Sequence, residues 1–229
     1  MKLMHYLFSD PIEFDDNRLQ QLVFENPRDM GIMVKELYEQ TRGYSGRFVL
    51  YDGVKDLNIA RDVILIDSPI GLDRFDKPIL QGVLTKSIDT LKGPDFQLET
   101  YSLMASLESL IGRAMLDVDD SLHSEGIDIS RMIKTMDLEL IHKNNVSEDI
   151  MESCDMIFKY TNTKMIAVCN LSTYIENTEF ENLLKGLAYL NSPILIIDRI
   201  HLNAYPSKLF DEDFCEINLK NGSANIFEV

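Results

Sequence analysis

Residues 19–40 read LQQLVFENPRDMGIMVKELYEQ, and this stretch decides the fold. Its first six residues are mostly apolar, which predicts a strand, and Asn26-Pro27 ends that strand. From Asp29 to Gln40 the pattern changes, because the apolar residues recur at helical spacing: Ile32, Met33 and Leu37. The chain is therefore expected to pass from a strand through a short turn into a helix.

Further strands are expected on both sides of this unit along the chain. They are Leu3–Phe8, Ile12–Phe14, Arg47–Tyr51, Asp62–Asp67, Met165–Cys169, Ile194–Ile197 and Phe214–Leu219. Asp62–Asp67 is an unbroken apolar run between two carboxylates, which is typical of a strand covered on both faces. The alternation of strands and helices predicts an α/β fold with a mostly parallel sheet and right-handed crossovers.

The middle of the chain has a helical pattern. Its clearest apolar stripe recurs at three- and four-residue steps: Tyr101, Met104, Leu107, Ile111 and Ala114. Another helix is expected to begin at Ser147, a residue type that favours the N-cap. We predict an α/β head domain formed by residues 1–80 and 161–229, split in sequence by an elongated helical leg domain of residues 81–160.

The turn after the first strand of residues 19–40 lies where a phosphate-binding loop belongs, and Asp67 resembles the strand-end aspartate that holds Mg²⁺. A working loop needs G-x-x-x-x-G-K-[ST], in which glycine amides and the lysine bind the phosphates. Here residues 25–31 read ENPRDMG, and the sequence contains no Gly-Lys dipeptide. The histidines are scattered and no nucleophile motif accompanies them. We therefore predict a degenerate head that resembles P-loop nucleotide hydrolases, with no catalytic residues and no enzymatic activity.

Composition restricts the class of partner. The net charge of −16 repels nucleic acid and anionic membranes at long range. The longest uncharged stretch, Gly186–Ile197, is far shorter than the roughly 20 residues that a membrane span needs. The three cysteines form no CxxC pair, and no secretory signal is visible. We expect a cytoplasmic protein with no membrane partner.

An acidic tract at residues 117–128, DVDDSLHSEGID, holds five carboxylates and no lysine or arginine. Carboxylate oxygens are the ligands that Ca²⁺ prefers, but the sixth position is Leu122, where an EF-hand needs glycine. Two interpretations stay open, a looser Ca²⁺ site and a solvated acidic loop. The candidate ligands are Asp117, Asp119, Asp120, Glu125 and Asp128.

A basic stretch at residues 42–47, RGYSGR, combines arginine, tyrosine and glycine. Arginine supplies charge, tyrosine stacks on bases and glycine allows close approach, so Arg42 and Arg47 are candidates for contact with a nucleic-acid backbone. A solvated connection between two elements is the other interpretation.

Several stretches in order resemble the type II-A CRISPR-associated spacer-acquisition proteins. They are residues 157–160 (IFKY), 164–171 (KMIAVCNL), 192–198 (SPILIID) and Tyr205-Pro206 with 211–214 (DEDF). The opening at residues 8–12 (FSDPI), followed by a turn and a strand that runs into Glu25, is similar as well. The resemblance covers essentially the whole chain.

The resemblance implies a homotetrameric ring whose central channel holds the ends of double-stranded DNA, without enzymatic activity. It also implies Ca²⁺ bound by carboxylates of the leg, and partners in the CRISPR spacer-integration complex and the effector nuclease. Asp117, Asp119 and Glu125 match the acidic positions of the family best, and Asp120 and Asp128 match less closely. The residues that fall where the family is basic, and are thus candidates for DNA contact, are Lys134, Lys159 and Lys164.

Two other functions stay open. An active P-loop nucleotide hydrolase would need a phosphate loop elsewhere in the chain. A protein-binding adaptor that does not contact DNA would explain the net charge of −16 most simply.

Overall fold

The structure is a computed structural model, and it describes residues 1–16, 18–118 and 126–217. The chain forms two compact units. The first contains Met1–Phe75 together with the residues from His142 onward, and the second contains Asp76–Ile141. None of the helices among the described residues combines the length and the apolar character needed to cross a membrane.

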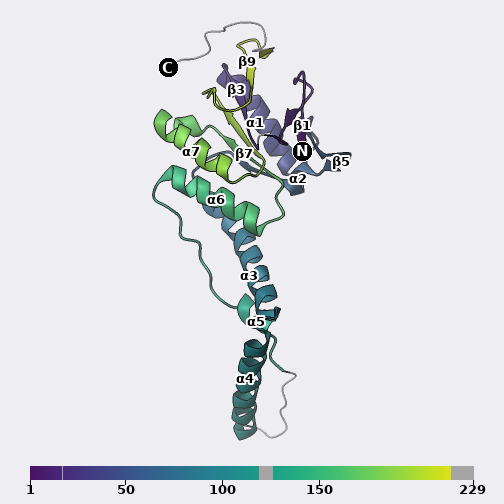
Figure 1. The fold of residues 1–229 in the computed structure, drawn as a ribbon, viewed down its shortest axis with the longest axis vertical. Helices are drawn as coiled ribbons and strands as arrows, with labels where there is room; N and C mark the ends of the chain where they lie inside the picture. The colour runs from purple at the N-terminus through teal and green to yellow at the C-terminus, as the bar shows by residue number, and fades with distance from the viewer. Residues whose placement is uncertain (17, 119–125, 218–229) are drawn as a thin grey trace. The chain divides into compact units, whose positions relative to one another are not determined.

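The first unit is built on a mixed sheet whose strands come from both ends of the chain (Figure 1). Within the described residues its order is β10 (Glu216–Ile217), β9 (Ser207–Phe210), β3 (Leu19–Phe24), β8 (Ile194–Asp198), β7 (Met165–Cys169) and β6 (Val63–Ile66). The strands from β9 to β6 are parallel, and β10 alone pairs antiparallel with its neighbour. β3, β7 and β8 are buried along their whole length. β7 and residues 194–197 of β8 are continuous apolar runs, whereas β3 also buries Gln20 and Gln21.

Helices cover this sheet on both faces (Figure 1). α1 (Pro27–Thr41) contributes Met30, Met33 and Leu37 to the main apolar core, where they join alternate residues of the strands. The intervening strand residues point to the opposite face. On that face α7 (Asn177–Tyr189) contacts β3, and α6 (Val146–Tyr160) packs on α7. The expected α/β fold with a mostly parallel sheet is therefore confirmed.

A small antiparallel sheet accompanies the main one. Its order is β2 (Ile12–Glu13), β1 (Lys2–Met4), β4 (Val49–Asp52) and β5 (Lys55–Leu57). The sequence predicts Arg47–Tyr51 as a strand of the parallel sheet, and this prediction is wrong. β4 instead forms a hairpin with β5, because Gly53 adopts a φ of 60° that a tight hairpin turn requires. The next strand of the main sheet after β3 and α1 is β6, which follows the short helix α2 (Ile59–Asp62).

The C-terminal strands also differ from expectation. Phe214–Leu219 is predicted as one edge strand, but Phe214 lies in a turn with a φ of 62°. The strand begins at Glu216 and pairs with β9, which the sequence does not predict. Residues 218 and 219 lie outside the described residues.

The second unit consists, in its described residues, of α3 (Asp76–Lys92), α4 (Gln97–Val118) and α5 (Ile129–Lys134). It is shorter than the predicted helical region of residues 81–160, because α6 belongs to the first unit. The N-cap of α6 is Asn145 and not Ser147, which lies inside the helix. The Ser147 hydroxyl and the Asn145 amide both donate to Glu179 of α7, at 2.7 and 2.9 Å, and so tie α6 to the first unit.

One buried histidine links the small sheet to α1. His5 is fully buried, and its Nδ1 accepts from the Leu7 amide at 3.4 Å, so the ring proton sits on Nε2. Nε2 lies 3.5 Å from the Glu36 carboxylate and makes no hydrogen bond among the described residues. Burial lowers the pKa of His5, Glu36 opposes this shift and Arg47 adds to it. Hydrogen bonds from Arg47 lower the pKa of Glu36 to about 2.

The protein is expected to lose stability as the pH falls from 7 towards 5. Because the pKa of His5 is lower in the folded than in the unfolded chain, the unfolded chain takes up the proton first. This contribution to stability is complete above about pH 6.5 and decreases as the pH falls through that value. In urea unfolding at pH 7 and pH 5.5, His5→Phe should show a smaller drop than the wild type. Equal drops in the two proteins would mean that His5 does not titrate on unfolding.

Candidate functional site

The turn from β3 into α1 uses its own backbone donors. Asn26 is the N-cap of α1, and its side chain accepts from the Arg28 amide at 2.9 Å. The Asn26 carbonyl accepts from the amides of Asp29 and Met30, both at 3.2 Å, and Pro27 has no amide proton to offer. Gly31 lies inside the helix and not in the turn. The amides that surround phosphates in a P-loop are therefore satisfied within this chain.

Asp67 does not lie beside that turn. It follows β6, and β7 and β8 lie between β6 and β3 in the sheet. Asp67 instead forms an ion pair with Arg74. The comparison of Asp67 with a magnesium-holding aspartate is therefore wrong, because sequence order along the chain differs from strand order in the sheet.

The carboxylate next to the end of β3 is Asp198, at the end of β8. The strand predicted at Ile194–Ile197 stops one residue before it, so Asp198 was not identified as a candidate. Its side chain is buried and accepts hydrogen bonds from the Arg199 amide at 2.7 Å, the Ser172 amide at 3.0 Å and the Ser172 hydroxyl. These contacts hold the loop after β7, so Asp198 has a structural role.

ATP and GTP are expected not to bind, because the β3–α1 turn has no lysine and its first amides are occupied. Calorimetric titration with each nucleotide and Mg²⁺ measures this directly. Heat of binding that saturates at micromolar nucleotide would contradict the prediction.

The described ends of the acidic tract lie in two helices. Asp117 is exposed in the last turn of α4, and Asp128 is the N-cap of α5. The Ser130 amide donates to Asp128 at 2.8 Å and is the main cause of the lowered pKa of Asp128. Asp119, Asp120 and Glu125 lie outside the described residues. Among the described residues, no three acidic, histidine or cysteine side chains gather around a point that a metal ion could occupy.

A further carboxylate approaches the end of this tract. Glu108 of α4 accepts from the Ile127 amide at 2.8 Å, next to Asp128 in sequence. Glu108 was not predicted from the sequence, since it lies nine residues before the tract. Its position on the same helix as Asp117 is the one signal that points to it.

The candidate basic residues differ in whether a carboxylate or hydroxyl group of the chain already contacts them. Lys159 pairs with Asp155 at 2.6 Å. The Arg47 guanidinium donates three hydrogen bonds to the Glu36 carboxylate, the shortest at 2.6 Å. Arg42 donates to the Tyr38 hydroxyl at 2.6 Å.

Lys134 and Lys164 are exposed and form no ion pair among the described residues. Lys164 lines a hollow of about 470 Å³ together with Arg18, which was not predicted from the sequence, and with the carboxylates of Asp15 and Asp52. Lys134 lies in the second unit and Lys164 in the first.

Comparison with known proteins agrees with the resemblance in the sequence. The family model for the CRISPR-associated protein (Cas_Csn2) matches residues 40–214. A search of curated proteins finds no match. The matched region contains α6, β7, α7, β8 and β9 and so includes most of the sheet described above. This chain belongs to the type II-A CRISPR-associated Csn2 family of spacer-acquisition proteins.

Proposed function

We propose that this chain serves CRISPR spacer acquisition by binding the ends of double-stranded DNA without regard to sequence and without catalysis. It acts as a homotetrameric ring stabilised by Ca²⁺ in the cytoplasm. The partners of the ring are the spacer-integration complex and the effector nuclease.

The exposed apolar surface of α4 carries the proposal of assembly. Of its 22 residues, only Thr100 is buried within the chain. The exposed residues include Leu98 at 84%, Leu103 and Tyr101 at 62% each, and Val118 at 82%. An exposed apolar surface of this extent is unusual on a monomer and marks an interaction site. Closed symmetry supplies a second copy of the same surface to cover it.

The strand order supports a head derived from a P-loop-like fold. β3 is the first parallel strand along the chain, leads directly into α1, and lies between β8 and β9. Nucleotides bind in α/β sheets at the point where the strand order changes direction, next to such a strand. In this chain Asn26 and Pro27 occupy that place, which favours a binding role over hydrolysis.

Calcium is proposed to bind at the acidic tract. Asp117 and Asp128 lie at its two described ends, and Glu108 contacts the backbone beside Asp128. Asp128 accepts from the Ser130 amide with one oxygen and lies 3.9 Å from Arg131 with the other, so a cation at Asp128 would replace this exposed ion pair. Asp119, Asp120 and Glu125 are the remaining proposed ligands.

Asp119→Asn is expected to lower the melting temperature in calcium but to change it little in chelator. A ligand that binds only the folded chain adds about 2.7 kcal/mol at a hundredfold excess over its Kd. Differential scanning fluorimetry in both conditions measures the effect. Asp95→Asn, which removes an exposed carboxylate outside the tract, is the control. A similar loss in chelator would mean that the tract is a solvated loop.

The proposed function is tested by competition between linear and closed circular duplex of the same length, with and without Ca²⁺. Linear DNA should compete and circular DNA should not, and removal of Ca²⁺ should weaken binding to the linear form. Light scattering in calcium should give the mass of four chains. Equal competition by the circle would overturn the binding of ends.

The net charge of −16 favours a second candidate, a protein-binding adaptor without DNA. The competition experiment with linear and circular duplex distinguishes the two candidate functions. An adaptor would bind neither form of DNA at physiological salt while still forming a defined assembly.

A further inference from the structure

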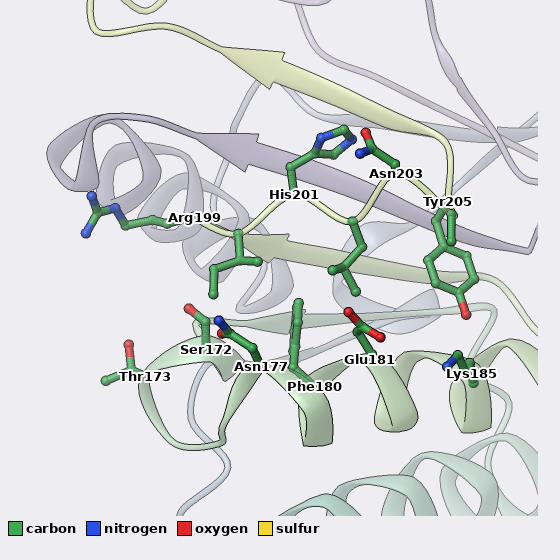
Figure 2. A pocket seen from close by; sticks show the side chains of 13 residues that line it. Ser172, Thr173, Asn177, Phe180, Glu181, Lys185, Arg199, His201, Asn203 and Tyr205 are labelled. Carbon is green, nitrogen blue, oxygen red and sulfur yellow. The ribbon is translucent and has the colours of Figure 1, made fainter. Parts of the chain in front are cut away.

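A groove of about 1090 Å³ lies in the first unit at the carboxyl ends of β7 and β8 (Figure 2). One wall is the loop after β7 with the first turns of α7, and the other wall is the connection from Arg199 to Tyr205 between β8 and β9. We call it the β8–β9 groove. Crevices outside the carboxyl ends of parallel strands are the usual ligand sites of α/β sheets.

Buried polar side chains fix both walls of the groove. Gln21, which is 1% exposed, donates to the Leu202 carbonyl at 2.8 Å and to the Tyr205 carbonyl at 3.2 Å, and accepts from the Leu202 amide at 3.2 Å. Asp198 holds the opposite wall through Ser172. The groove is thus formed without a ligand, which lowers the entropy that binding costs.

The lining changes character along the groove (Figure 2). Its partly exposed apolar side chains are Ile200 and Leu202 of the β8–β9 connection, while Phe180 of α7 is buried. Arg199 lies at the end near Ser172 and Thr173, and Lys185 lies at the opposite end near Tyr205 (Figure 2).

Several polar side chains of the lining have unused hydrogen-bonding groups. Those that form no hydrogen bond or ion pair within the described parts of the chain are Asn177, Glu181, Lys185, Asn203 and the Tyr205 hydroxyl. Amide and hydroxyl groups of this kind pair with the main chain of an extended peptide.

We propose that the β8–β9 groove binds an extended segment of a partner protein that carries a carboxylate next to a large apolar side chain. The apolar side chain packs on Ile200 and Leu202, and the carboxylate pairs with Arg199. Two cations, Arg199 and Lys185, face one carboxylate, Glu181, so the lining is locally positive in a chain of net charge −16. Electrostatic complementarity of this kind selects an acidic segment at this place and repels it elsewhere on the surface.

A nucleic acid fits this lining less well. Affinity for nucleic acid comes from several cations that track the phosphates. The groove instead has an apolar centre between two cations, with Glu181 beside that centre. The inference therefore does not depend on the proposed binding of DNA ends, and the two can fail separately.

The test starts from a phage library of random dodecapeptides selected on the full-length protein in calcium. Enriched peptides should share an aspartate or glutamate close to a leucine, isoleucine or phenylalanine. A fluorescein-labelled representative should bind Arg199→Glu and Lys185→Glu about tenfold more weakly than wild type, as loss of a close charge pair predicts. Arg199→Lys, which keeps the charge, should retain most of the affinity.

Lys55→Glu makes the same change of charge on exposed β5, away from the groove, and should bind the peptide like wild type. Circular dichroism checks that each variant is folded. If Arg199→Glu does not fold, Lys185→Glu still tests the groove. No enrichment, enriched peptides without acidic residues, or equal binding to the folded groove variants would overturn the proposal. Displacement of the peptide by a short blunt DNA duplex would also overturn it and assign the groove to nucleic acid.

Discussion

Lys134→Glu is expected to weaken binding of linear duplex DNA on the order of a hundredfold at physiological salt, because a ring of four chains repeats each cation four times. Lys134 lies in the last turn of α5, and among the described residues no carboxylate neutralises it. Loss of four phosphate contacts should also lower the salt dependence of the binding constant by about four in slope. Fluorescence anisotropy at several salt concentrations gives both quantities.

The structure ranks the other candidates in the same experiment. Lys164→Glu should have a large effect, since Lys164 is exposed and forms no ion pair in the described part of the chain. Lys159 and Arg47 should have smaller effects, because Asp155 and Glu36 already offset their charges. Lys55→Glu, on exposed β5, is the matched control. If the lysine variants bind normally while Arg42 and Arg47 variants do not, DNA lies on another surface than the one proposed.

Asp198→Ala is expected to destabilise the fold by about 3 kcal/mol, since it removes a buried acceptor and leaves three donors unsatisfied. The donors are the Arg199 amide and both the amide and hydroxyl of Ser172. Total stabilities of domains are about 5–15 kcal/mol, so the loss is a substantial fraction. The free energy of unfolding in urea measures it.

Ser172→Ala is the matched control for Asp198→Ala. It removes one hydroxyl and leaves the two amide donors paired with Asp198, so it should cost about 1 kcal/mol. Equal losses in the two variants would show that the carboxylate contributes nothing beyond its contact with the hydroxyl.

The buried strands could be predicted from the sequence because apolar residues dominate them. Leu19–Phe24 and Met165–Cys169 have the predicted bounds, and β8 extends the prediction by one residue to Asp198. β9 was missed because Ser207 and Lys208 interrupt its apolar pattern. A half-exposed strand such as β4 carries no sign of the sheet to which it belongs.

The site could be predicted only in part, for related reasons. The absence of a working phosphate loop follows from residues 25–31 alone. The identity of the carboxylate beside β3 does not, because strand order in the sheet places Asp198 there and moves Asp67 three strands away. The sequence likewise shows which side chains are charged but not which of them form ion pairs. The structure pairs Lys159 with Asp155 and Arg47 with Glu36. The calcium ligands and the DNA contacts stay predictions.

The pairing of β3 with β8 has a consequence for how the chain folds during synthesis. Val23 of β3 lies opposite Asp198 of β8. The ribosome synthesises β8 long after β3, so the centre of the main sheet cannot form until β8 has been made. At ribosomal rates of about 5–20 residues per second, this delay is on the order of ten seconds or more. The second unit is continuous in sequence and is complete well before then. We therefore expect β3 to stay sensitive to proteolysis in nascent chains that stop before Ile194, and to become protected once β8 has been made.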